Sequence, residues 1–198
     1  YNSQVVVACR GQSFSKLKQS SYPESCDLLM IVNDWHPAIP RDFVEKHADK
    51  TVNYLTQMSA RRKRFSDIPE IRSSKAHDKV KKILATLGAA QHDAWQNLWG
   101  TKDTGLRAVA IASLVSTHVI IGGLDFWEAD YWDDSHHKHP DKVKMELAKK
   151  MKKGNDHKES WMAAFVEYMR AKSDTFFTIF TCSHTLKLQT RAENLENV

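Results

Sequence analysis

The sequence predicts a single doubly wound α/β domain with a mainly parallel sheet. Short apolar runs rich in β-branched residues recur along the chain, as in strands buried on both faces of a parallel sheet. Segments with helical periodicity separate these runs, which is typical of strand–helix–strand crossovers. The 198 residues are 41% hydrophobic and 27% charged, an ordinary globular composition, so we expect one domain spanning residues 1–198.

Five segments are expected to be strands. The first two are the unbroken apolar runs Val5–Cys9 and Leu28–Val32, and Thr51–Thr56 is a weaker third. His118–Gly123 and Thr175–Cys182 supply the remaining two. Polar residues or glycines follow most of these runs, as expected where a buried strand reaches the edge of a sheet.

Four segments are expected to be helices. Asp78–Leu87 and Ser160–Ala171 have apolar residues at helical spacing, and Pro140–Met151 is a lysine-rich segment of similar character. Thr104–Leu114 is rich in alanine and opens on a Thr-Gly pair, in which Thr104 is a reasonable N-cap. The sequence contains no internal repeat and no linker long enough to divide two domains.

Composition excludes several classes of protein. No run approaches the roughly 18 uncharged apolar residues that a membrane span requires. The net charge of +5 is modest and both signs are interspersed, so no nucleic-acid partner is expected. Cys9, Cys26 and Cys182 form no CxxC pair, and we expect buried, reduced thiols in a cytoplasmic protein. No signal-peptide pattern is visible.

The loop after the first expected strand is a candidate binding site, because ligands of open parallel sheets bind beyond the carboxyl ends of the strands. It reads Arg10-Gly11-Gln12-Ser13. Its glycine would allow a close approach of backbone N–H groups to an anion, and its serine can donate a hydroxyl. Many strand-to-helix turns contain glycine and serine, so the motif taken alone favours a purely structural turn.

Two further positions have a structural and a functional interpretation. Thr104-Gly105 fits either a simple helix start or a contact to a phosphate or sugar. Asp125 follows an apolar strand, where a carboxylate must be solvated, capped or functional.

Four blocks of sequence, taken in order, resemble a known enzyme family. They are VVVACRGQSF (5–14), DLLMIVN (27–33), TGLRAVAIASLVSTHVIIGGLDFW (104–127) and TIFTCSHTL (178–186). Together they resemble the bacterial sialyltransferases of glycosyltransferase family 42, typified by Campylobacter lipooligosaccharide sialyltransferases. The order and approximate spacing agree over nearly the whole chain, apart from its basic middle section.

The resemblance implies a Rossmann-like fold, a variant of the GT-A glycosyltransferase fold, with a mobile lid that corresponds to residues 127–157. It implies an inverting, metal-independent transfer of sialic acid, or a related sugar, from a CMP-linked donor to a glycan hydroxyl, without a cofactor. The implied partners are the nucleotide sugar and the glycan acceptor. Self-association and peripheral contact with a membrane are left open, and we expect a compact catalytic core.

The resemblance also implies roles for particular residues. The donor-binding positions are Arg10, Gly11, Ser13, Asn33, Thr56, Thr104, Gly105 and Asp125. The general base corresponds to His157, since a neutral histidine can accept the proton of an attacking hydroxyl near neutral pH. Without the resemblance, the position of His157 among ten histidines favours a surface histidine at a helix end. Two lid tyrosines that stabilise the departing phosphate correspond to Trp127 and Tyr131, although Trp127 keeps only an indole N–H donor.

Departures from the family pattern keep two other hypotheses open. Arg10 and Thr56 stand where the family has asparagines. The family also has an arginine shortly before the turn that corresponds to Thr104-Gly105; this chain lacks it, and Lys102 is the cation nearest to that position. These differences fit a divergent, non-catalytic nucleotide-binding relative. Alternatively, the run Arg61-Arg62-Lys63-Arg64 fits a basic module that contacts nucleic acid or a membrane.

A histidine-rich segment, His136-His137-Lys138-His139, follows a pair of aspartates. Its spacing matches no ordered zinc site, so we expect no metal ligands there.

Overall fold

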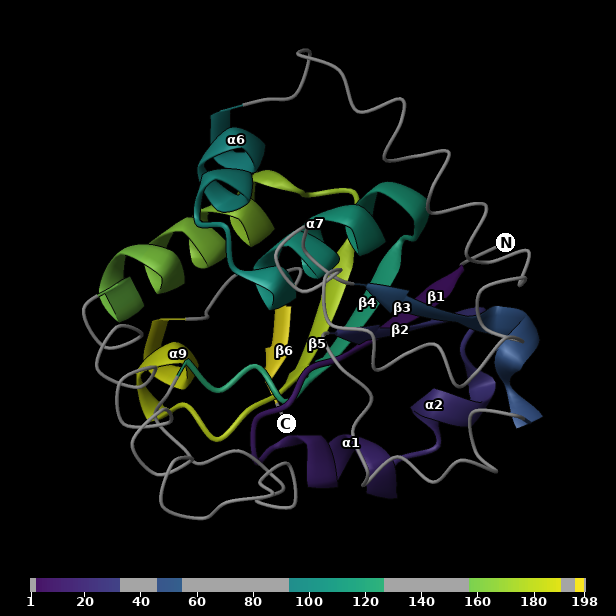
Figure 1. The fold of residues 1–198 in the computed structure, drawn as a ribbon. Coiled ribbons are helices and arrows are strands. Elements are labelled where there is room, and N and C mark those ends of the chain that lie inside the picture. Colours follow the sequence, from purple (N-terminus) through teal and green to yellow (C-terminus); the bar gives the residue numbers. More distant parts are fainter. Residues whose placement is uncertain (1–2, 33–45, 55–92, 127–156, 190–194, 198) are drawn as a thin grey trace, which may run out of the picture.

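The structure is a computed structural model that describes residues 3–32, 46–54, 93–126, 157–189 and 195–197 (Figure 1). In this part of the chain, a six-stranded parallel sheet carries helices on both faces. Its strands are β1 (Gln4–Ala8), β2 (Leu28–Val32), β3 (Thr51–Tyr54), β4 (His118–Gly122), β5 (Phe176–Phe180) and β6 (Leu195–Asn197). The predicted α/β class with a parallel sheet is confirmed.

The strand order is β3-β2-β1-β4-β5-β6, so the direction in which the sheet grows reverses between β1 and β4. The central strand β1 pairs with both neighbours, and Val6 lies opposite Leu29 of β2 and Ile120 of β4. These side chains are almost completely buried. Both faces of the central strands are covered, which explains why their sequences are continuous apolar runs rather than alternating ones.

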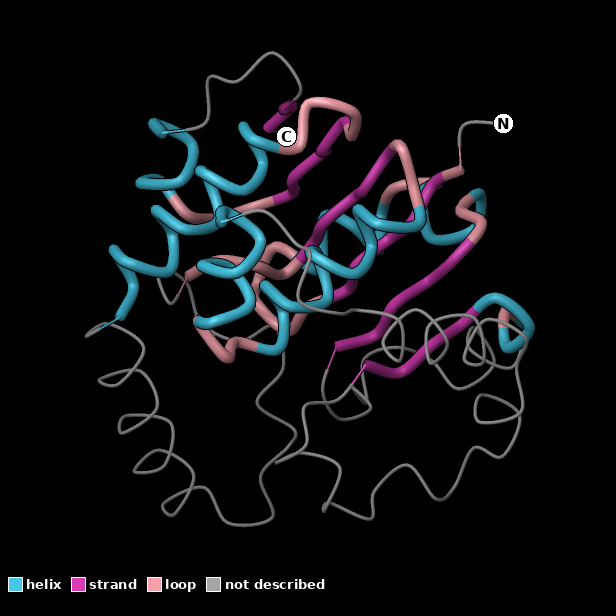
Figure 2. The backbone as a smooth tube through the Cα atoms, turned by 90° about the horizontal axis from the view of Figure 1, so that it is seen from above, coloured by secondary structure: helices cyan, strands magenta, loops and turns pink. Residues whose placement is uncertain are grey.

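The helices form a layer on each face of the sheet (Figure 2). On one face, α1 (Phe14–Gln19) packs through Phe14 and Leu17, and the short α2 (Tyr22–Ser25) follows it. The other face is covered by α6 (Asp93–Gly100), α7 (Thr104–Val115), the helix formed by residues 157–171, and α9 (His184–Gln189). The short η1 (Ala48–Lys50) leads into β3.

The predicted elements agree with the structure where it describes them, with shifts at their ends. β2 is found as expected, β1 ends one residue before Cys9, and α7 extends one residue beyond its predicted end. β5 is shorter than Thr175–Cys182, because Thr181 and Cys182 leave the ladder to contact Asp125. Helices α1, α2, α6 and α9, the short η1 and strand β6 are additional.

Several predictions lie outside the described residues. These are the helices expected at 78–87 and 140–151, the end of the third strand at 55–56, and all of the expected lid except His157.

Candidate functional site

Three loops meet beyond the carboxyl ends of β1, β4 and β5, and we call them the edge loops: 9–13, 123–126 and 181–183. Backbone hydrogen bonds continue the β1–β4 pairing into the first two. The Cys9 N–H donates to the Gly122 carbonyl at 2.7 Å, and the Gly11 N–H donates to the Gly123 carbonyl at 2.7 Å. The two loops at the reversal of strand order are therefore joined directly through their backbones.

A single buried carboxylate ties all three edge loops together. Asp125 is only 3% exposed, and its Oδ2 accepts a hydrogen bond from the Ser13 N–H at 2.9 Å. Its Oδ1 accepts from the Cys182 N–H at 2.8 Å and from the Thr181 hydroxyl at 3.2 Å. Hydrogen bonds to a charged acceptor are short and strong, and they offset the cost of burying the carboxylate.

Gly11 and Ser13 allow the loops to approach so closely. The Ser13 hydroxyl oxygen accepts a hydrogen bond from the Gly123 N–H at 2.9 Å, and Ser13 is fully buried. A Cβ on Gly11 would lie 2.6 Å from the Gly123 carbonyl oxygen and would also collide with the Asp125 carboxylate. Gly123 itself has a φ of +79°, which favours glycine. The structure thus brings the predicted donor-binding residues Gly11, Ser13 and Asp125 together, and their contacts hold the edge loops to one another.

The start of α7 differs from the sequence-based expectation. Asp103, and not Thr104, is the N-cap: its Oδ1 accepts a hydrogen bond from the Leu106 N–H at 2.9 Å. Burial raises the pKa of Asp103. Aspartate outranks threonine as an N-cap, which accounts for the shift by one residue. Thr104 is half-buried in the first turn, and Gly105 is buried behind it.

This cap changes the chemistry available at α7. The side-chain carboxylate already satisfies an N–H group at the positive end of the helix dipole. A phosphate bound there would meet the negative charge of Asp103, whereas a sugar hydroxyl would find an acceptor.

Two cationic residues lie in the segments that form this edge. Arg10 is half-buried in the first edge loop, between Cys9 and Gly11. Lys102 is exposed just before the cap of α7, and its backbone is left-handed, with a φ of 59°. Phe126 is also left-handed, with a φ of 48°, which is uncommon for a bulky residue and marks local backbone strain.

His157 is exposed in the first described turn of helix 157–171, so it lies within the helix rather than before it. Its ring stacks on Trp161, one turn further on, with the ring centroids 5.4 Å apart and an interplanar angle of 11°. This pair favours a helix that begins earlier than the predicted Ser160. The helix leads to β5 at the amino edge of the sheet, where the Phe176 N–H donates to the Thr117 carbonyl, so its first turn lies toward the carboxyl side.

The cysteines follow the expectation only in part. Cys9 and Cys26 are buried free thiols, and burial raises the pKa of each. Cys182 is exposed, so the prediction that it is buried is wrong. Its position is fixed by its backbone N–H, which donates to Asp125, while its side chain belongs to an edge loop and not to β5.

Four predicted site residues, Asn33, Thr56, Trp127 and Tyr131, lie outside the described residues, as do the histidine-rich segment 136–139 and the basic run 61–64. Within the described ranges, no three His, Cys, Asp or Glu side chains are grouped so that they could hold a metal ion. In the same ranges, no helix is both long enough and apolar enough to cross a membrane.

Sequence reasoning missed three residues of this region: Asp103, Thr181 and Trp161. The cap was readable from the Asp-Thr-Gly order before an alanine-rich helix. Thr181 acts through a contact with Asp125, which is distant in sequence, whereas Trp161 stacks on His157 one helical turn away. No protein-family model, curated protein or solved structure matches the chain.

Proposed function

We propose that the protein is a glycosyltransferase similar to bacterial sialyltransferases, which moves sialic acid or a related sugar from a CMP-linked donor to a glycan hydroxyl. The observation that carries this proposal is the reversal of strand order between β1 and β4, with the edge loops directly beyond it. The order β3-β2-β1-β4-β5-β6 is that of Rossmann folds, in which nucleotides bind outside the carboxyl ends of the strands at this point.

The charges at this edge suggest how a donor would be oriented. Arg10 would pair with the donor phosphate, to which a guanidinium can donate two parallel hydrogen bonds. Asp103 and Thr104 would face sugar hydroxyls rather than the phosphate, because the cap is a carboxylate. Asp125, Gly11 and Ser13 would hold the loop that carries Arg10. This division of roles refines the expectation that all these residues contact the donor.

In the proposed reaction, the acceptor oxygen forms a bond to the anomeric carbon while the bond from that carbon to the phosphate oxygen breaks. CMP leaves with the electron pair, and His157 accepts the acceptor proton. The reaction requires neither a metal nor a cofactor. Segment 127–157 would provide the lid that excludes water from the donor, with Trp127 and Tyr131 close to the departing phosphate. A cytoplasmic location, with or without contact to a membrane surface or self-association, is part of the same proposal.

Thermal unfolding with CMP, UMP, GMP and AMP tests the donor class, and release of CMP from CMP-sialic acid tests the reaction. We expect selective stabilisation by CMP, which Arg10→Ala weakens and Lys16→Ala, an exposed cation on α1, leaves unchanged. His157→Ala should abolish transfer and retain the stabilisation, whereas His184→Ala, another exposed histidine, should retain both.

The outcomes separate the candidate functions. Absence of both CMP release and cytidine-selective stabilisation would contradict the proposal. Cytidine-selective stabilisation without turnover by the unmodified protein would favour a non-catalytic nucleotide-binding relative. The hydrogen bonds that Gly11, Ser13 and Asp125 make to one another's loops support this alternative, because they are contacts within the protein. Binding to anionic vesicles or RNA that weakens with salt, without nucleotide binding, would instead indicate a basic interaction module.

A further inference from the structure

A hollow of about 450 Å³ lies between α6 and the first turns of helix 157–171. Its lining includes Asn97 and Thr101 on one side and Ser160, Trp161, Ala164 and Glu167 on the other. We infer that this hollow binds a neutral carbohydrate, which, if the proposed function holds, is the acceptor of the transfer. The hollow is wide open to solvent, and its volume is comparable with that of ordinary small-ligand pockets, roughly 300–1,000 Å³.

The chemistry of the lining matches a sugar. The half-buried ring of Trp161 offers an apolar surface for the C–H face of a pyranose, and Ala164 leaves space beside it. Asn97 and Glu167 are both exposed, so their amide and carboxylate are accessible from solvent. A few polar groups around an aromatic surface are typical of sites that fix the orientation of a small ligand.

The lining is rich in hydrogen-bond acceptors. The Ser160 hydroxyl donates to the His157 carbonyl at 2.9 Å, and the Thr101 hydroxyl donates to the Leu98 carbonyl at 2.7 Å. Each therefore has its proton engaged. The Thr101 oxygen also accepts a hydrogen bond from the Asp103 N–H at 3.3 Å, which leaves the second lone pair of Thr101 and the lone pairs of Ser160 as acceptors for a ligand. Together with the Glu167 carboxylate, these groups suit a ligand that carries many hydroxyl donors.

The charge of the lining argues against an anionic ligand. Among the described residues that line the hollow, Glu167 is the ionisable one, and none is Lys, Arg or His. A phosphate or a sialate carboxylate would meet a like charge without a compensating cation. The hollow therefore does not suit the donor nucleotide, and it differs in this respect from the edge that carries Arg10.

The hollow also adjoins the proposed base. Trp161 belongs to the lining and its ring stacks on the His157 ring at a centroid distance of 5.4 Å. Ser160 is likewise in the lining and bonds to the His157 carbonyl. Trp161 and Ser160 thus connect the hollow to the helix turn that carries His157.

Binding of lactose to the full chain, without any donor, tests this inference by saturation-transfer NMR and titration. Ala163→Phe, at an exposed position in the lining, fills the hollow and should abolish binding. Asn97→Ala should weaken it about fivefold, the effect of one neutral hydrogen bond. The matched controls are Gln96→Ala and Ala171→Phe, which are exposed on the same two helices and outside the lining, and they should bind as the parent does.

Unchanged lactose binding by both Ala163→Phe and Asn97→Ala would overturn the inference, as would tighter binding of CMP or free sialic acid at the same site. Asn97 is exposed, so its variant keeps the test valid if the larger side chain prevents folding. Thermal shifts with CMP on the same variants separate the two proposals. Lactose binding with neither a thermal shift by CMP nor release of CMP from CMP-sialic acid would support the sugar site and contradict the transferase. A thermal shift by CMP without lactose binding would overturn the sugar site alone.

Discussion

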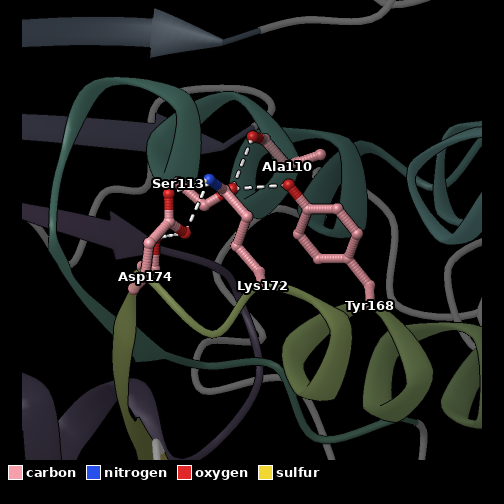
Figure 3. Close-up of polar contacts among 6 residues, drawn as sticks. Ala110, Ser113, Tyr168, Lys172 and Asp174 are labelled. Atoms are coloured by element: carbon pink, nitrogen blue, oxygen red, sulfur yellow. Dashed lines mark hydrogen bonds and ion pairs between the residues drawn. The ribbon is translucent and has the colours of Figure 1, made fainter. Parts of the chain in front are cut away.

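At the carboxyl edge of the sheet, the buried Asp125 carboxylate accepts hydrogen bonds from two other loops. Toward the amino edge, neutral hydroxyls hold the helices together (Figure 3). There the Tyr168 hydroxyl donates to Ser113 Oγ over 2.6 Å, and Ser113 in turn donates to the Ala110 carbonyl at 2.9 Å. Left-handed backbone at Gly123 and Phe126 adds to the contrast, since both residues belong to the carboxyl edge.

Buried charge and backbone strain are thus concentrated at the carboxyl edge of the sheet, where binding is proposed. Such features persist only where the surrounding structure holds them, and they occur preferentially at functional sites. We therefore expect changes at the carboxyl edge to lower both the free energy of unfolding and cytidine binding. Changes near the amino edge should lower the free energy of unfolding alone.

The largest effect is expected for Asp125→Ala. It leaves the buried N–H group of Ser13 and the partly buried N–H group of Cys182 without their acceptor, which should lower the free energy of unfolding by about 4 kcal/mol. Asp125→Asn retains one amide oxygen as an acceptor and should cost about half as much. Urea denaturation measures both, and a loss below about 1 kcal/mol for the alanine variant would show that the edge loops do not depend on this carboxylate.

Gly11→Ala should have the next largest effect. The new Cβ would lie 2.6 Å from the Gly123 carbonyl oxygen and would press on Asp125, so we expect a loss of about 2 kcal/mol from overpacking. Gly100→Ala is the matched control, because nothing lies within 4 Å of a Cβ built there. It should leave stability unchanged or raise it, since alanine favours a helix. Equal denaturation midpoints for the two variants would contradict the close approach at Gly11.

Tyr168→Phe tests the hydroxyl pair and should cost about 1 kcal/mol at neutral pH. Burial raises the pKa of Tyr168 from its ordinary value of 10.0 to about 12. The unfolded chain therefore loses this proton before the folded one, so the contribution is complete below pH 10 and disappears as the pH rises from 10 to 12. Denaturation midpoints measured across this interval should fall more steeply for the parent than for the variant, and parallel curves would exclude the effect.

The smallest effect is expected for Asp174→Asn. The Lys172 ammonium donates to both carboxylate oxygens, at 2.7 and 2.8 Å, and this hydrogen bonding lowers the pKa of Asp174. Its contribution is present above the pKa of the unfolded chain and is lost as the pH falls through the folded value. Because Asp174 is exposed, we expect a loss of at most about 0.5 kcal/mol at neutral pH. A larger loss by urea denaturation would mean that the ion pair is shielded from water.

The local sequence was sufficient to predict an element where the residues of a whole segment are buried in the same way. The run Leu28–Val32 predicts β2 without error, because every residue of a central parallel strand is buried. The alanine-rich run that forms α7 likewise predicts its helix to within one residue at its end. The shift from Thr104 to Asp103 at the cap shows the limit of that approach, since two neighbouring residues can both accept the hydrogen bond.

The position of the candidate site was predictable from the sequence, but the roles of its residues were predictable only in part. Strand ends in a parallel sheet meet at one edge, so the sequence could indicate Gly11, Ser13 and Asp125 as neighbours. The sequence could not reveal that Asp125 accepts hydrogen bonds from Thr181 and Cys182, which lie more than fifty residues away along the chain. The exposure of Cys182 follows from the same contact, since that contact draws residue 182 out of the strand.

The sequence alone determined the α/β class, the central strands and the edge at which the loops of the candidate site meet, because apolar periodicity acts locally and parallel strands share their ends. Tertiary structure alone decided the strand order, the internal contacts of Asp125, the carboxylate cap of α7 and the hollow beside Trp161. Each of these depends on which distant segments pack together. That choice is made by the burial of complementary surfaces across the whole sheet, and no single segment encodes it.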